Sequence, residues 1–144
     1  MPSPIPAETT YVAASFLGTV WLLVGQTYVV TRYRAKSGVQ YPRLYAEKAE
    51  MDANPNAYVF NCIQRAHQNT LEYLPIFFTS TLLTSLKYPI LASLLLGTWT
   101  VSRVGYTIGY ATNRRMNPLS ILHYPMLIGL VGSATYTVFQ LLWS

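Results

Sequence analysis

The run from Thr10 to Thr31 constrains the fold most strongly, because it holds 22 consecutive residues without a charged side chain. An α-helix needs about 20 such residues to cross the hydrocarbon core of a bilayer. No Lys or Arg precedes this run, and no small-residue cleavage site follows it. We therefore expect a retained transmembrane helix over about residues 9–36 and not a cleaved signal peptide.

Later apolar stretches predict three further helices, over about residues 57–86, 89–112 and 119–143. Asn54-Pro55 favours a turn before the first of these, and Pro89 is tolerated in the first turn of the next. Pro125 favours a kink near the start of the last. With no alternating strand pattern, the sequence predicts an all-α fold: a single membrane domain, residues 1–144, built as an integral membrane four-helix bundle with up-down connections.

The composition agrees with a membrane protein. Charged residues make up 10% of the chain, whereas about 25% is typical of soluble domains. The net charge is +5, but the basic residues lie at the ends of apolar runs, which favours an anionic membrane surface or substrate over nucleic acid. Cys62 is the single cysteine, so an internal disulfide and a multi-cysteine metal site are excluded, and we predict no metal.

Basic residues are unevenly divided among the predicted loops. The first and third loops together hold seven of them, namely Arg32, Arg34, Lys36, Arg43, Lys48, Arg114 and Arg115. The second loop holds Lys87 alone, and the termini hold none. By the positive-inside rule, the long first loop is cytosolic and both termini are lumenal.

Three charged residues nevertheless lie inside the predicted spans: Arg65, Glu72 and Arg103. A charge at the bilayer centre costs about 2.5–3.5 kcal/mol on insertion scales, so such residues usually face a bundle interior and mark function. Spacings of four, four and three place one set of polar residues on a single helix face, beside Tyr73: Asn61, Arg65, Asn69 and Glu72.

The next helix carries a matching face, because Arg103, Tyr106 and Tyr110 are spaced three and four apart. At 1.5 Å per residue, Arg65 lies roughly 12 Å inside the start of its helix and Arg103 roughly 13 Å before the end of its own. The Arg34 side chain, at the end of the first helix, can reach the same region. These residues predict a positively charged pocket that opens to the cytosol.

Each of these residues also has a purely structural interpretation. An Arg65–Glu72 pair could stabilise packing, and Arg103 could extend to the lipid headgroups. Tyr106 and Tyr110 could be packing or interface aromatics, and His67 could be a hydrogen-bonded bystander. The conjunction of these groups at one depth favours a binding site.

The motif "FNCIQRAHQNTLEYLP" closely resembles the second-helix signature of the membrane-associated eicosanoid and glutathione metabolism (MAPEG) family. Within that family it is most similar to the type-three microsomal glutathione transferases. "RVGYTIGY" resembles the third-helix motif of the family, and "VQYP" after the first basic cluster also fits. The resemblance covers nearly the whole chain in span count, loop order and motif position.

The resemblance implies a homotrimer in the endoplasmic reticulum or outer mitochondrial membrane, with glutathione bound as co-substrate between subunits near the cytosolic face. It assigns these glutathione contacts: Arg34, Arg65, His67, Asn69, Glu72 and Tyr73, then Tyr106 and Tyr110, with Arg103 in support. Arginines suit the two carboxylates of glutathione, and a carboxylate such as Glu72 suits its ammonium. Nearby positive charge also lowers the pKa of a thiol toward the reactive thiolate.

One departure concerns the arginine that related enzymes are thought to use for thiol activation. In the leukotriene C synthases it lies seven positions past the second tyrosine, where this chain has Asn117. Arg114 and Arg115 lie four and five positions past Tyr110, and we take them as the catalytic candidates, with Arg115 favoured.

The sequence therefore predicts a membrane-bound glutathione transferase that attacks lipophilic electrophiles through the thiolate and also acts as a glutathione-dependent peroxidase on lipid hydroperoxides. The alternative is a non-enzymatic lipid-binding adaptor resembling the lipoxygenase-activating member of the family. An ion or proton pathway is a weaker interpretation, because Glu72 is the only acid inside a predicted span.

Overall fold

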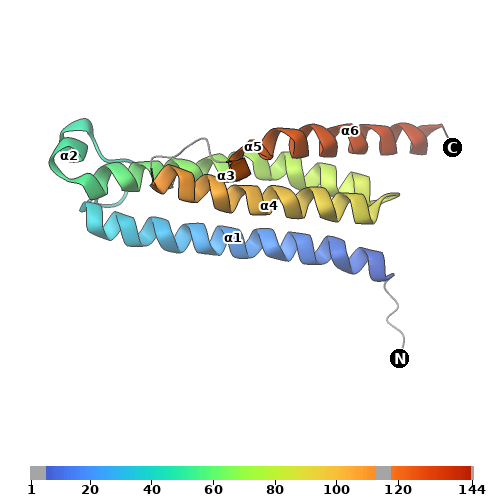
Figure 1. Cartoon of the computed structure of the whole chain (residues 1–144), viewed down its shortest axis with the longest axis horizontal. Helices are drawn as coiled ribbons and strands as arrows, with labels where there is room; N and C mark the ends of the chain where they lie inside the picture. The colour runs from blue at the N-terminus through green and yellow to red at the C-terminus, as the bar shows by residue number, and fades with distance from the viewer. Residues whose placement is uncertain (1–5, 113–117, 144) are drawn as a thin grey trace, which may run out of the picture.

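The structure is a computed structural model that describes residues 6–112 and 118–143. Its regular elements in those ranges are all helices (Figure 1): α1 Ala7–Ser37, α2 Lys48–Ala53, α3 Pro55–Ser85, α4 Pro89–Ala111, α5 Pro118–Ile121 and α6 His123–Leu142. The four long helices lie along one axis and alternate in direction, which gives an up-down bundle (Figure 1). The prediction of an all-α fold is confirmed.

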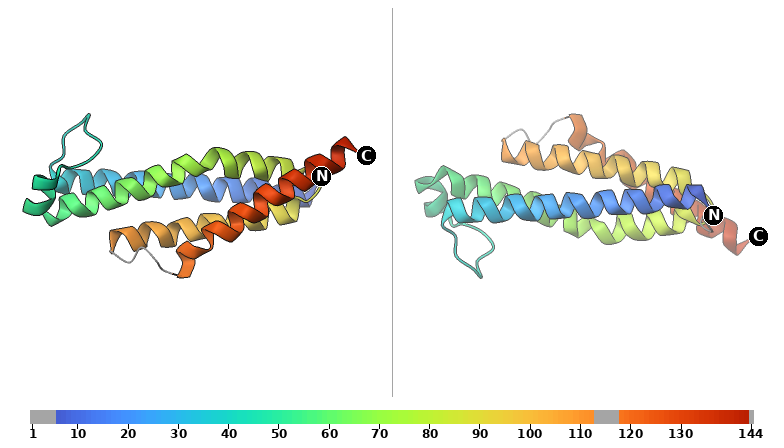
Figure 2. Two further views of the ribbon diagram at one scale, coloured as in Figure 1. Left: turned by 90° about the horizontal axis from the view of Figure 1, so that it is seen from above. Right: turned by 90° about the horizontal axis from the view of Figure 1, so that it is seen from below.

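The helices pack unequally. α1, α3 and α4 all contact one another, whereas α6 contacts α3 and α4 but, within the described residues, not α1. Figure 2 shows α6 crossing the bundle obliquely on the side away from α1. One flank of α3 is therefore covered by α1 and α4, and another by α4 and α6.

The long polar connection contains the short helix α2, which was not predicted. A capping box starts it: the Glu47 backbone N–H donates to Glu50 Oε2 at 2.8 Å, and the Glu47 side chain accepts from the backbone of Glu50. α3 then begins with Pro55 at its first position, behind Asn54, whose side chain accepts from the Asn56 N–H at 3.0 Å. These local bonds order the connection between α1 and α3.

Arg43 and Glu50 hold this connection from outside the membrane span, through contacts of 2.8 and 3.0 Å. The Arg43 guanidinium and the Glu47 N–H lower the pKa of the Glu50 carboxyl. The pair therefore stabilises the connection above the ordinary Glu pKa of about 4.3, and this contribution is lost as the pH falls through the lowered folded-state value. We expect an NMR titration to place the Glu50 midpoint below that of a free Glu and Arg43→Ala to raise it. An unchanged midpoint in Arg43→Ala would contradict this pairing.

α1 ends at Ser37 and is capped by Gly38, which adopts φ 76°, a left-handed conformation that disfavours any residue with a Cβ. We expect Gly38→Ala to lower the free energy of unfolding by about 1–2 kcal/mol. Gly18→Ala is the matched control, because Gly18 lies inside α1 and a Cβ there would meet nothing within 4 Å. That change should be neutral or stabilising by up to about 1 kcal/mol. Equal effects in thermal unfolding would show that the left-handed cap has no energetic role.

The last apolar run, expected over 119–143, divides into α5 and α6 at Leu122. Pro125 is the physical reason, because it has no N–H to donate to the Ile121 carbonyl four residues earlier. At the break itself, the Leu122 N–H donates to Leu119 O at 3.2 Å, a three-residue spacing that is tighter than that of an α-helix. The break brings His123 into the interior, where it is 6% exposed.

Two apolar clusters form the core, and a polar layer lies between them. One cluster lies near the α2 end and includes Phe60 and Ile63, both fully buried. The other includes Phe77 and Trp99, whose rings stack 4.0 Å apart. The segment of α3 between these clusters carries the polar motif found in the sequence.

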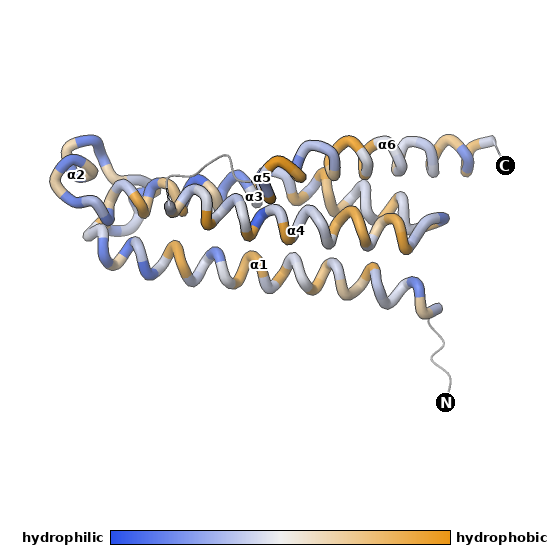
Figure 3. The backbone as a smooth tube through the Cα atoms, viewed as in Figure 1, coloured by the Kyte–Doolittle hydropathy of each residue, from blue (hydrophilic) through white to orange (hydrophobic). Residues whose placement is uncertain are grey.

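The outer surface is apolar. Among the described residues, two segments are long and apolar enough to span a bilayer, Ala7–Ser37 and Pro118–Leu142. Large side chains such as Trp21 and Ile128 are 67% and 73% exposed. Hydrophilic residues gather around α2, whereas apolar ones predominate along α4 and α6 (Figure 3). Such a surface suits contact with acyl chains.

Candidate functional site

The outward face of the polar layer carries an ion pair. Arg65 Nη1 lies 2.8 Å from Glu72 Oε1, and Arg65 Nη2 lies 3.3 Å from Glu72 Oε2. The seven-residue spacing places both on one face of α3, and their side chains are 46% and 54% exposed. Half-exposed charges midway along a spanning helix are unfavourable against lipid, so water, a ligand or another chain must cover this face.

Arg103 of α4 lies behind this face and is 1% exposed. Its Nη2 donates to Asn69 Oδ1 at 2.8 Å, and its Nε donates to Thr70 Oγ1 at 3.1 Å. The guanidinium carbon lies 3.9 Å from the centre of the Tyr106 ring. No carboxylate in the described ranges pairs with Arg103, so its buried charge is held by uncharged acceptors and by the Tyr106 ring.

Phenol groups surround Arg103. The Tyr106 ring lies against the guanidinium, and the ring centres of Tyr106 and Tyr110 are 4.6 Å apart. Tyr73 is in edge contact with His123 at 4.4 Å, and His123 Nδ1 accepts a hydrogen bond from Trp99 Nε1 at 3.0 Å. His123 thus connects the α5–α6 break to Tyr73.

Gln26 of α1 is a residue that sequence reasoning missed. It is 3% exposed and bonds three side chains: its Nε2 donates to Thr70 Oγ1 at 3.0 Å and Thr107 Oγ1 at 2.8 Å, and its Oε1 lies 3.2 Å from His67 Nδ1. The signal was a side-chain amide, the only one in the uncharged run from Thr10 to Thr31. Gln26 therefore joins α1, α3 and α4 within the polar layer.

Arg34 lies apart from Arg103 and holds the connection after α1. It is 7% exposed, its Nη1 donates to Arg43 O at 2.7 Å, and its guanidinium lies over the rings of Tyr41 and Phe60 at 4.4 and 4.7 Å. Its Nε is buried without a hydrogen-bond partner in the part of the chain that the structure describes. An adjoining groove of about 240 Å³ is lined by Arg34, Gly38 and Tyr41 among others.

The predicted site residues thus fall into two groups. The first group, on the exposed face of α3 and the adjoining part of α4, contains Arg65, Asn69, Glu72, Tyr73, Arg103, Tyr106 and Tyr110. The second contains Arg34, which is on α1, and His67, whose side chain turns toward α1. The catalytic candidates Arg114 and Arg115 lie outside the described residues.

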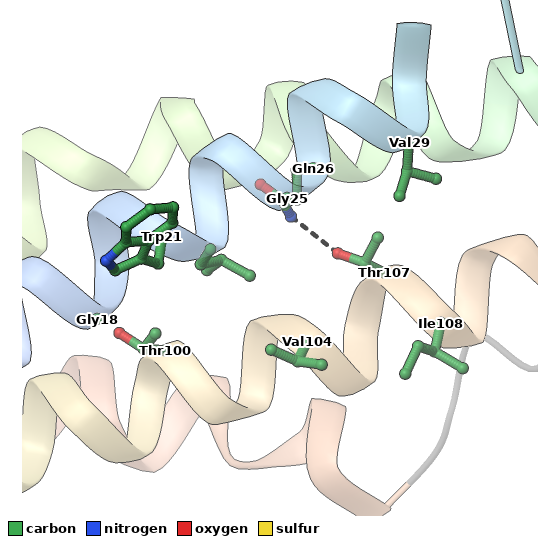
Figure 4. Close-up of a pocket in the computed structure, with 10 residues that line it drawn as sticks. Gly18, Trp21, Gly25, Gln26, Val29, Thr100, Val104, Thr107 and Ile108 are labelled. Carbon is green, nitrogen blue, oxygen red and sulfur yellow. Dashed lines mark hydrogen bonds between the residues drawn. The ribbon is translucent and has the colours of Figure 1, made fainter. Parts of the chain in front are cut away.

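A separate apolar groove of about 420 Å³ runs between α1 and α4 (Figure 4). Gly18, Trp21 and Val104 are among the residues that line it. Its two threonine hydroxyls are already bonded, Thr100 to Thr19 at 2.7 Å and Thr107 to Gln26 at 2.8 Å. The groove therefore presents a dry surface that suits an acyl chain.

The apolar exterior and the polar layer between the two apolar clusters define an integral membrane helical bundle. Its polar site lies at the edge of α3 and α4. The described residues contain no group of three or more His, Cys, Asp or Glu side chains placed to hold a metal ion.

The MAPEG family model matches residues 10–139, and the chain therefore belongs to the MAPEG family. Members of this family are membrane helical bundles that use glutathione, and they include glutathione transferases, related enzymes and non-enzymatic proteins. The family prediction is confirmed.

Proposed function

We propose that this chain is a membrane-bound glutathione transferase that also reduces lipid hydroperoxides with glutathione. The observation that carries the proposal is Arg103, a buried cation with no carboxylate partner among the described residues. It lies behind an exposed Arg65–Glu72 pair and is surrounded by phenols. This arrangement suits a small anionic ligand that also carries an ammonium group.

Glutathione has two carboxylates, one ammonium and a thiol. Its carboxylates would bind the arginines, and its ammonium would replace Arg65 as the partner of Glu72. Because the Arg65–Glu72 pair is half-exposed, opening it costs little. The cationic surroundings would favour the thiolate, and Arg115 or Arg114 remains the candidate for its activation.

The division of the site residues supports a trimeric assembly. Arg34 and His67 lie on the α1 side of α3, away from the exposed Arg65–Glu72 face. In a ring of identical subunits, the α1 side of one copy would cover the charged face of the next and complete the pocket. The proposal places this pocket toward the cytosol of the endoplasmic reticulum or outer mitochondrial membrane, with both termini lumenal.

The chemistry is nucleophilic attack by sulfur. In conjugation, the thiolate forms an S–C bond and the electrophile releases its leaving group. In peroxide reduction, the thiolate attacks one peroxide oxygen, the O–O bond breaks and the lipid alcohol leaves; a second glutathione then reduces the sulfenic acid to give glutathione disulfide and water. The lipophilic substrate would arrive from the bilayer.

Turnover of the purified protein in detergent with 1-chloro-2,4-dinitrobenzene and a fatty-acid hydroperoxide tests the proposal. We expect glutathione-dependent consumption of at least one of them. Saturable glutathione binding without turnover would remove the enzymatic proposal. Fatty-acid binding that ignores glutathione would instead support the adaptor.

A further inference from the structure

The orientation of the Gln26 amide follows from the two threonines that it contacts. The Thr70 hydroxyl donates its proton to Ala66 O at 2.9 Å, and the Thr107 hydroxyl donates its proton to Arg103 O at 2.8 Å. Each threonine oxygen can therefore only accept from Gln26. Both N–H groups of the amide must face the threonines, as Figure 4 shows for Thr107. A flipped amide would leave the layer with two fewer hydrogen bonds.

This orientation determines where neutral His67 carries its proton. With both N–H groups used, Gln26 presents only its carbonyl Oε1 to His67 Nδ1, at 3.2 Å. Nδ1 must then be the donor, so it carries the ring proton and Nε2 carries a lone pair. His67 Nε2 makes no hydrogen bond with the described residues. It is not fully buried, so it is accessible at the surface.

We infer that Gln26 is a positioning residue that holds neutral His67 in the Nδ1–H form and so makes His67 a hydrogen-bond acceptor toward the ligand. The ligand assignment rests on the proposed function. His67 then accepts from an N–H or the S–H of glutathione, whereas the arginines bind its carboxylates. The same Thr70 oxygen that accepts from Gln26 also accepts from Arg103 Nε. Gln26 therefore contacts His67 directly and shares one acceptor oxygen with Arg103.

The position of the proton can be measured directly, without glutathione. The chain has two histidines, so ¹⁵N-histidine NMR of the full chain in detergent gives two ring patterns, and His67→Asn assigns them. At a pH where His67 is neutral, we expect protonated Nδ1 and unprotonated Nε2. Gln26→Leu should shift His67 toward the other form. A proton on Nε2 of His67 in the unmodified protein would overturn the inference.

A matched pair of variants separates this effect from packing. Thr107→Val and Thr100→Val each remove one hydrogen bond between α1 and α4, but only the first involves Gln26. We expect Thr107→Val to change the His67 ring pattern and Thr100→Val to leave it unchanged. Equal changes would assign the effect to helix packing and contradict a specific role for Gln26.

Glutathione titrations test the acceptor role. Asn at position 67 keeps a polar group near the Nδ1 position, whereas Gln reaches the Nε2 position. We expect His67→Asn to weaken glutathione binding about three- to tenfold, as for one hydrogen bond, and His67→Gln to stay within about threefold. The reverse order would contradict an Nε2 acceptor. If the unmodified protein bound no glutathione while the NMR result held, the proposed function would fail and the assignment for Gln26 would stand.

Discussion

Replacing Arg103 with methionine is expected to weaken glutathione binding at least tenfold and to lower the temperature of thermal unfolding. A hydrogen bond to a charged group contributes about 1.5–3 kcal/mol, and a change of about 1.4 kcal/mol in binding free energy corresponds to a tenfold change in affinity. Methionine has a similar volume but cannot donate to the Asn69 and Thr70 oxygens, so a loss of stability of about 1–3 kcal/mol accompanies the loss of binding. Binding by calorimetry and unfolding in the same detergent measure both quantities.

Arg103→Lys is the control for charge. It keeps the cation but loses the fork of donors that reaches Asn69 and Thr70 together. We expect its affinity to lie between those of the unmodified protein and the methionine variant. If Arg103→Met unfolded at a much lower temperature and yet bound glutathione normally, Arg103 would be a structural residue.

The second large effect concerns Arg65 and Glu72. We expect Arg65→Ala to weaken glutathione binding about 10- to 100-fold, because a charge-assisted contact to a carboxylate is lost. The exchange Arg65→Glu with Glu72→Arg restores an ion pair between the same positions but presents the wrong charge to each end of the ligand. The double variant should therefore fold but not bind glutathione. Recovery of binding would show that the pair is structural.

The chain contains its own control for this experiment. Arg43 and Glu50 have the same seven-residue spacing, also make two contacts and are 41% and 37% exposed. Arg43→Ala removes an ion pair of the same kind away from the Arg65–Glu72 face and keeps the backbone carbonyl that accepts from Arg34. We expect it to leave glutathione affinity unchanged. An equal loss in Arg43→Ala and Arg65→Ala would mean that any exposed ion pair affects binding indirectly.

Helical periodicity was sufficient to predict the long helices and the charged face of α3. The spacing of Arg65, Asn69 and Glu72 depends only on 3.6 residues per turn, and packing did not alter it. The same arithmetic separates His67 from Arg65, because two residues correspond to about 200° around a helix. The division of the site into two groups was therefore partly readable from the sequence.

Other features depended on contacts between distant segments. Arg34 bonds the backbone carbonyl of Arg43, and no side-chain pattern encodes such a partner. The role of Gln26 depends on Thr70 of α3 and Thr107 of α4. The sequence did not distinguish these two threonines from the other polar residues of their helices. The α5–α6 break followed from Pro125, which the sequence marked as a kink without fixing where the helix would end.

The central claim is that the arginines and phenols at the edge of α3 and α4 bind glutathione and hold its thiolate. An equilibrium titration of the purified protein in detergent with glutathione, followed by thiolate absorbance, tests it most directly. We predict saturable binding at or below millimolar glutathione, with an absorbance increase near neutral pH that Arg103→Met abolishes. No saturable signal at millimolar glutathione, or an identical signal from Arg103→Met, would contradict the claim.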